Sequence, residues 1–168
     1  NDKKSKSNFL AYYNTFFIAE KSFEEALELI QTNNVNDKNI TSQIEKLLDD
    51  AIRNSLVIEK DFYQTKYIDD AYYILGMSSY YKNKITAAKY YFQILLDLYP
   101  ETNYLNNVKI HMSFIDLEIG RINDFESKIS LIELKYLNNE EKYNYYRLMA
   151  YYHEIFNDNH SINENYIK

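Results

Sequence analysis

Three histidines, His111, His153 and His160, and the carboxylates near them are the residues that could support acid–base or metal chemistry. An imidazole acts as a general base or a metal ligand only when a second group lies within reach. His111 and Asp116 are not one helical turn apart, and His153 and Glu154 would point in different directions on a helix. The sequence contains no HExxH motif, glycine-rich phosphate loop or nucleophile elbow. We therefore expect structural or solvated histidines, no enzyme activity, no cofactor and no metal site.

Two pairs of adjacent carboxylates, Asp49–Asp50 and Asp69–Asp70, are the other candidates for acid–base chemistry. Carboxylates are favoured in the first turn of a helix by its dipole, so we expect helix-end or solvated charges at both pairs. A carboxylate–histidine metal site assembled from distant segments is the alternative, although no spacing requires one. We expect the three methionines, Met77, Met112 and Met149, to fill gaps in a core or a groove.

The composition restricts the fold that must position these residues. The chain has 168 residues, of which 46% are hydrophobic, with 2 Gly, 1 Pro, 19 Tyr and 9 Phe. Tight β-turns and phosphate-binding loops need glycines, so this chain is most easily built from helices joined by short polar connections. The length corresponds to one domain or one array of repeats, and it is sufficient to bury a sizeable core.

Charge and cysteine content exclude further classes of partner and site. The net charge is −6 and no long basic stripe is present, so we expect no nucleic-acid partner. The absence of cysteine removes disulfides, thiolate nucleophiles and cysteine-based zinc sites. No apolar run approaches the ~20 residues of a membrane span, so we expect no membrane-spanning segment.

The positions of large and small residues repeat along the chain with a shift of 37 residues, and the clearest unit covers 69–102. Small residues at one set of equivalent positions would let the two helices of a hairpin approach closely. The set of small residues is Gly76, Ser113 and Ala150. The other equivalent sets are Ala51, Ala88 and Phe125; Ile58, Leu95 and Ile132; Phe62, Tyr99 and Tyr136; and Leu75, Met112 and Met149.

Apolar residues recur every three to four positions over most of the chain, which favours helices over strands. Asn138–Asn139 can supply an N-cap side chain, and Asn83 and Gly120 lie where hairpin turns are expected. The segment Ser161–Lys168 has the pattern of the start of another second helix. The predicted helices cover residues 8–20, 23–33, 40–61, 68–82, 85–98, 104–119, 122–136, 139–156 and 160–167.

The unit at 69–102 resembles a tetratricopeptide repeat (TPR). The family pattern has a large aromatic residue, then Leu-Gly, then a small residue, an aromatic residue and a closing proline. Ser79 departs from that pattern, because an aromatic residue is usual there, and Tyr80 lies beside it. The matching residues are Tyr72, Leu75, Gly76, Ala88, Phe92 and Pro100.

The resemblance implies an all-α fold, a TPR-like right-handed superhelix of antiparallel helix pairs. About four pairs fit within the chain. Residues 1–8 are expected to form a flexible tether, and residues 9–168 a single repeat domain.

The order of segments is similar to that of BamD-type outer-membrane lipoproteins. The resemblance covers about residues 9–156, with a match at Tyr12–Ala26, a longer connecting helix, and a second match at Tyr67–Gly76. It implies a periplasmic protein anchored by lipid at the inner leaflet of the outer membrane. Such proteins contact the β-barrel insertase and unfolded outer-membrane protein segments. A lipidated cysteine would then precede Asn1 in the precursor, and the membrane would be reached only through that anchor.

A TPR array presents a groove lined by the first helix of each pair. In this chain the lining would be aromatic and apolar with few charges, which suits a peptide rich in aromatic side chains. A Lys/Asn clamp for chaperone C-termini would need Lys or Asn at Tyr73 and Met77, so that function is not expected. For any single tyrosine, packing between repeats is the alternative. The predicted groove residues are Tyr73, Met77, Tyr80, Tyr81, Asn107, Ile110, Phe114, Leu117, Asn144, Arg147, Tyr151 and Glu154.

The resemblance implies a protein-binding scaffold that makes and breaks no bonds and works in the assembly of outer-membrane β-barrel proteins. The alternative is a general TPR adaptor in another envelope or cytosolic complex. A hydrolase or metal protein is the hypothesis from a different class.

Overall fold

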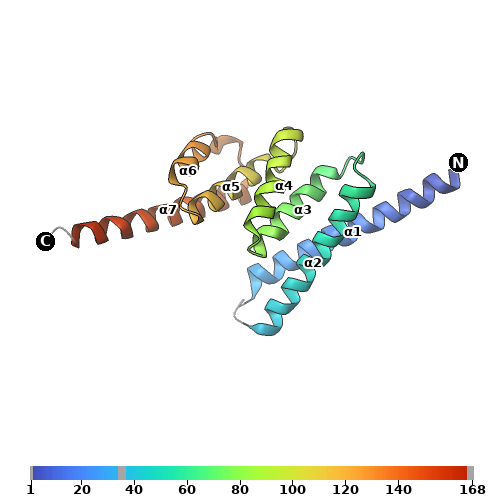
Figure 1. The fold of residues 1–168 in the computed structure, drawn as a ribbon, viewed down its shortest axis with the longest axis horizontal. Helices are drawn as coiled ribbons and strands as arrows, with labels where there is room; N and C mark the ends of the chain where they lie inside the picture. Colours follow the sequence, from blue (N-terminus) through green and yellow to red (C-terminus); the bar gives the residue numbers. More distant parts are fainter. Residues whose placement is uncertain (1, 34–36, 166–168) are drawn as a thin grey trace. The chain divides into compact units, whose positions relative to one another are not determined.

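Helices make up most of the described chain, and no strand occurs in that part. The computed structural model describes the backbone of residues 2–33 and 37–165 and the side chains of residues 13–33 and 37–155. Over these residues it has seven α-helices and one short 3₁₀ helix, η1 (Figure 1). The all-α prediction is therefore confirmed. The bounds are α1 Asp2–Thr32, α2 Lys38–Asp61, α3 Ile68–Tyr81, α4 Ile85–Leu98, α5 Leu105–Glu118, α6 Ile122–Ile129, η1 Leu134–Tyr136 and α7 Asn139–Asn165.

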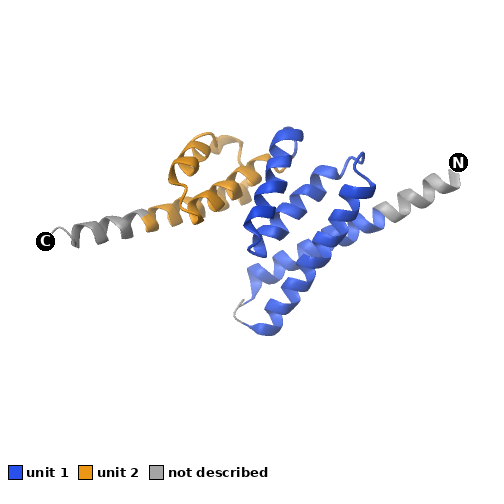
Figure 2. Cartoon of the chain, viewed as in Figure 1, with its two compact units in different colours: residues 1–102 blue, residues 103–168 orange. Residues whose placement is uncertain are grey.

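The chain divides into two compact units, Asn1–Thr102 and Asn103–Lys168 (Figure 2). In the first unit, α1 packs against α2, α2 against α3, and α3 against α4. In the second unit, α6 and α7 both pack on α5. The single repeat domain over 9–168 and its superhelical arrangement stay predictions.

The 37-residue repeat appears in the bounds of the helices. α3 covers Ile68–Tyr81 and α5 covers Leu105–Glu118, so both ends are displaced by the same interval. The second helices, α4 and α6, begin at Ile85 and Ile122 with that displacement too. Each unit therefore contains one hairpin built on the same frame, α3–α4 in the first and α5–α6 in the second.

The turns of the two hairpins have the same geometry, as predicted for Asn83 and Gly120. Both residues have left-handed backbone, with φ of 55° and 75°. Asparagine and glycine are the residues that tolerate this conformation best, and it closes a helix by a Schellman motif. The bonds of the two motifs are Lys84 N to Ser79 O (2.8 Å), Asn83 N to Tyr80 O (2.8 Å), Arg121 N to Asp116 O (2.7 Å) and Gly120 N to Leu117 O (3.1 Å).

α1 is one helix, whereas the sequence predicts two, at 8–20 and 23–33. The predicted break is wrong because the buried face continues through it. Phe16, Ala19, Phe23 and Ala26 are all buried, and their spacing of three and four residues keeps them on one side of a single helix. The helix also includes residues 2–8, which the sequence analysis expects to form a tether.

The two C-terminal helices also differ from their predicted lengths. α6 ends at Ile129 rather than continuing to 136, since it contains Asn123, Asp124 and Ser127, which form helices poorly. α7 runs without interruption to Asn165, so the predicted gap between 156 and 160 is absent from the described backbone. Its start is held as predicted by Asn138, whose Oδ1 accepts from Glu141 N at 2.9 Å. Glu141 Oε2 accepts from Asn138 N in return, at 2.8 Å, which completes a capping box.

Residues at the repeat positions form the cores of both units. Ala51, Ile58, Ala88 and Leu95 are completely buried in the first unit. The second unit has a cluster of buried apolar residues. In it the repeat positions Phe125 and Ile132 pack together with residues of α5 and α7. The cluster contains Ile110, Phe114, Leu117, Phe125, Ile132, Leu137 and Leu148.

Two repeat positions depart from their equivalents. Tyr136 is 68% exposed, whereas Tyr99 is half-buried against Tyr72 with ring centroids 5.8 Å apart. The early end of α6 explains this difference, because Tyr136 lies in η1 rather than at the end of a longer helix. Ala150 is exposed, although Gly76 and Ser113 are buried.

Candidate functional site

Four of the twelve predicted groove residues are buried. Met77 on α3 is 3% exposed, and Ile110, Phe114 and Leu117 on α5 belong to the core cluster of the second unit. Every residue of α5 from Ile110 to Leu117 is buried, so the helix is covered on all sides over that stretch. These four side chains therefore serve packing, and the prediction that they line an open groove is corrected.

The three tyrosines predicted on α3 are half-buried. Tyr73 packs edge-to-face against Phe23 of α1, with ring centroids 6.2 Å apart. Tyr80 and Tyr81 form another edge-to-face pair, with centroids 5.7 Å apart. Tyr73 thus joins two helices of the first unit, as the packing alternative anticipates, while Tyr81 also lines a cavity.

The predicted residues of the second unit that are not in its core lie on α5 and α7. Asn107 and Asn144 are half-buried, and the buried Oδ1 of Asn107 has no hydrogen-bond partner among the described residues. Arg147, Tyr151 and Glu154 are exposed, and their spacing of four and three residues places them on one face of α7. The Arg147 guanidinium lies 5.1 Å from the centroid of the Phe114 ring, a cation–π contact.

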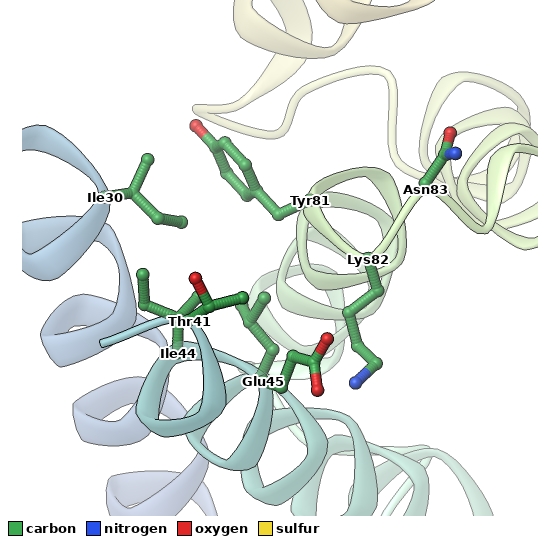
Figure 3. A pocket seen from close by; sticks show the side chains of 8 residues that line it. Ile30, Thr41, Ile44, Glu45, Tyr81, Lys82 and Asn83 are labelled. Atoms are coloured by element: carbon green, nitrogen blue, oxygen red, sulfur yellow. The ribbon is translucent and has the colours of Figure 1, made fainter. Parts of the chain in front are cut away.

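The first unit contains a cavity of about 440 Å³, here named the Tyr81 cavity, where the end of α1, the start of α2 and the end of α3 meet (Figure 3). Tyr81 and Ile30 point toward one another across it from α3 and α1, and Ile44 comes from α2. The side chains that line it are Ile30, Thr41, Ile44, Glu45, Leu48, Tyr81, Lys82 and Asn83. The cavity is therefore apolar on one side and polar on the other.

Charge at the polar side of the cavity is arranged by an ion pair between α2 and α3. Lys82 Nζ lies 3.0 Å from Asp49 Oδ2, and the Lys82 side chain is only 13% exposed. Glu45 lies one turn before Asp49 on α2. A cation held between two helices in this way keeps the polar wall in place without ordering a long exposed side chain.

Local sequence explains why these groups meet. Asp37 caps α2 by accepting a hydrogen bond from Asn39 N at 2.8 Å, which fixes where the helix begins and hence where Thr41 and Ile44 point. The left-handed turn at Asn83 ends α3 directly after Tyr81 and Lys82. Of the cavity residues, only Tyr81 is predicted from the sequence as a site residue. The others lie in the last turn of α1, in the first half of α2 and directly after α3, and no local sequence pattern joins them.

Among the described residues, the fully buried titratable side chains lie in the second unit. His111 is 2% exposed, and burial lowers the pKa of its imidazole to about 4. Its Nδ1 lies 2.9 Å from the backbone oxygen of Asn107. Because a carbonyl oxygen only accepts, Nδ1 carries the proton and donates it to this oxygen. His111 is thus a neutral structural residue at pH 7.

Asp116, also on α5, is completely buried and pairs with Lys128 of α6. A buried carboxylate is costly without such a partner, so the ion pair ties α6 to α5. Among the side chains that the structure describes, no three histidine, aspartate or glutamate groups lie close enough together to hold a metal ion. Over the described helices, none combines the length and apolar character needed to cross a membrane.

A scan against protein-family models and searches of curated proteins and solved structures found no match to this chain. The similarity to TPR and BamD-type proteins accordingly stays a prediction from the residues quoted above.

Proposed function

We propose that this chain is a non-enzymatic protein-binding scaffold of TPR-like helix pairs, which holds a segment of its partner in the Tyr81 cavity. The observation that carries the proposal is the cavity itself. Its volume of about 440 Å³ falls in the range of sites that bind ligands, roughly 300–1,000 Å³. An apolar wall beside a few polar groups is the usual composition of such sites.

The lining of the cavity suits one large apolar side chain of a partner segment. Ile30, Ile44 and the Tyr81 ring would contact that side chain, while Thr41 and Asn83 could form hydrogen bonds with the partner backbone beside it. Peptide recognition of this kind draws most of its affinity from a few buried anchors.

Binding of aromatic-rich peptides tests the proposal. A panel of fluorescently labelled peptides, each with one Phe, Tyr or Leu anchor between polar residues, is titrated with the 168-residue chain and followed by anisotropy. We expect Tyr81→Ala to weaken the best peptide by about tenfold or more while helix content by circular dichroism is preserved. Tyr90→Ala is the matched control, because Tyr90 is 59% exposed on α4 and does not line the cavity. Equal affinities of the two variants would reject the cavity as the binding site.

The more specific form of the proposal is a BamD-like role in the assembly of outer-membrane β-barrel proteins, with the β-barrel insertase and unfolded outer-membrane protein segments as partners. Its support is the sequence resemblance at Tyr12–Ala26 and Tyr67–Gly76. A signal peptide with a lipid-modified cysteine directly before Asn1 in the precursor would agree with this periplasmic, lipid-anchored role. A precursor that begins with a plain cytosolic methionine would reject it. Pull-down from envelope extracts then separates insertase components from the partners of a general adaptor.

A further inference from the structure

The polar side of the Tyr81 cavity carries an unbalanced negative charge. Three charged groups lie there: Glu45 and Lys82, which line the cavity, and Asp49, which pairs with Lys82. In the view of Figure 3, Glu45 lies between Ile44 and Lys82. Two carboxylates and one ammonium give this side of the cavity a formal charge of −1.

Lys82 is the only cation among the side chains that line the cavity, and its charge is already paired. The lysines at positions 46 and 84 are exposed and do not line the cavity. An anionic ligand could use Lys82 only by separating it from Asp49. Since the Lys82 side chain is only 13% exposed, breaking that pair would be costly. The cavity therefore does not favour a negatively charged ligand.

Glu45 is an exposed carboxylate, and none of the described side chains forms an ion pair with it. It lies one turn before Asp49 on α2, and like charges at this spacing repel each other. Because the Lys82 ammonium lies against Asp49, the charge of Glu45 is left without compensation. A cation supplied by a ligand would relieve the repulsion and complete the polar side of the cavity.

The other walls accept apolar atoms. Ile44 and Leu48 are buried, and Ile30 and Tyr81 are half-buried. Sites of roughly 300–1,000 Å³ hold whole drug-sized ligands, so a cavity of about 440 Å³ has room for more than one side chain. An apolar anchor can therefore enter beside a second side chain that reaches Glu45.

We propose that the segment bound in the Tyr81 cavity carries a lysine or arginine within two residues of its apolar anchor, and that this cation pairs with Glu45. The long apolar stem of either side chain can lie along the cavity wall while the charge stays at the exposed end. The net charge of −6 favours a basic partner at longer range as well. This inference rests on the proposed function and adds the charge of the partner to it.

Peptides that differ in a single charge test the inference. Each labelled peptide has one phenylalanine among serines and glycines, and lysine, glutamine or glutamate occupies one of the two positions on either side of it. Binding to the 168-residue chain is followed by anisotropy at low salt. We expect the best lysine peptide to bind about threefold more tightly than its glutamine counterpart, and the glutamate peptide to bind most weakly. Salt at about 0.5 M should remove most of this preference.

The variant Glu45→Gln removes the charge and keeps the size of the side chain. We expect it to bind the lysine and glutamine peptides equally, with its affinity for the glutamine peptide within about twofold of the wild type. Glu45→Lys should reverse the preference, so that the glutamate peptide binds more tightly than the lysine peptide.

The matched control is Glu101→Gln, which removes an exposed carboxylate of the same unit that does not line the cavity. We expect this control to keep the wild-type preference for lysine. Circular dichroism of all three variants checks that helix content is preserved.

The possible results separate this inference from the proposed function. Binding that depends on Tyr81 but does not distinguish lysine from glutamine would overturn the basic partner and leave the proposed function standing. A lysine preference that persists in Glu45→Gln, or that is lost equally in Glu101→Gln, would overturn the role of Glu45. No binding by any peptide, or binding that Tyr81→Ala does not weaken, would reject the proposed function and this inference with it.

Discussion

The hairpins α3–α4 and α5–α6 have the same frame and different contents. In α3–α4 the interface is aromatic, with Phe92 against the backbone of Gly76 and Tyr72 stacked on Tyr91. Burial, and then the charge of the Glu59 carboxylate, raises the pKa of Tyr72 to about 12. In α5–α6 the interface contains the buried ion pair of Asp116 and Lys128. The repeat therefore specifies where two helices approach, and either apolar or ionic side chains can fill the contact between them.

The largest expected effect is in the aromatic hairpin. The substitution Gly76→Leu places a side chain where the Phe92 ring lies, and the ring is completely buried and cannot move out of the way. We expect a loss of about 3 kcal/mol or more in the free energy of unfolding, measured by urea denaturation. Ala150→Leu, at the equivalent exposed position, should change it by less than about 0.5 kcal/mol. Similar losses in both variants would show that the two positions do not differ as described.

Acidification should destabilise the second unit through His111. Its folded pKa of about 4 lies below the ordinary 6.5, so the folded state binds fewer protons between these values. The resulting stability is fully present above pH 6.5 and is lost as the pH falls to 4, by roughly 3 kcal/mol in total. His111→Gln should flatten this part of the pH dependence, as followed by urea denaturation from pH 4 to 7. His153→Gln, a change at an exposed position on α7, should leave the dependence of the free energy of unfolding on pH as in the wild type.

The ionic contact of the second hairpin can be broken from its exposed end. Lys128→Met leaves the Asp116 carboxylate buried without its cation, and the Lys128 side chain is 35% exposed, which moderates the loss. We expect about 2–3 kcal/mol of destabilisation, seen as a lower midpoint in thermal unfolding. The control Lys135→Met removes an exposed cation beside Glu133 and should leave the midpoint unchanged. A neutral Lys128→Met would mean that the ion pair does not hold α6 to α5.

The smallest effect concerns the turns that the hairpins share. Nothing lies within 4 Å of a Cβ placed on Gly120, so Gly120→Ala tests only its left-handed backbone. We expect a loss of about 1 kcal/mol in chemical denaturation. Asn83→Gly, at the equivalent turn, should be neutral or raise stability by a few tenths of a kcal/mol. A neutral Gly120→Ala, or a clear loss of stability in Asn83→Gly, would contradict the common turn geometry.

Regular features of the fold could be predicted from the sequence because they depend on local periodicity. The 37-residue interval predicts the equivalent core positions, and Asn83 and Gly120 lie at the turns, as expected. The continuity of α1 could not be predicted from its polar residues, because the buried face of Phe16 to Ala26 decides it through tertiary packing. α6 ends early because it contains weak helix formers, Asn123, Asp124 and Ser127. The spacing of apolar residues alone does not reveal their effect.

Less of the candidate site than of the fold could be predicted from the sequence. Transfer of the TPR groove positions assigns Ile110, Phe114 and Leu117 to a surface, whereas α5 is covered on all sides there. The lining of the cavity comes from the ends of three helices, and no short motif joins residues as distant in sequence as Ile30 and Tyr81. The buried pairing of Asp116 with Lys128 likewise depends on the packing of α6 against α5.

The capping box at Asn138 and Glu141 has a consequence for the dynamics of α7. Its two reciprocal bonds satisfy backbone donors at the start of the helix, and Glu141 is only 5% exposed. Since a helix unwinds most easily from an end without such support, amide hydrogen exchange should be slowest near the buried Leu148 and accelerate toward Asn165. The C-terminal half can therefore open many times for each opening of the first turn, so rearrangement there does not require the second unit to unfold.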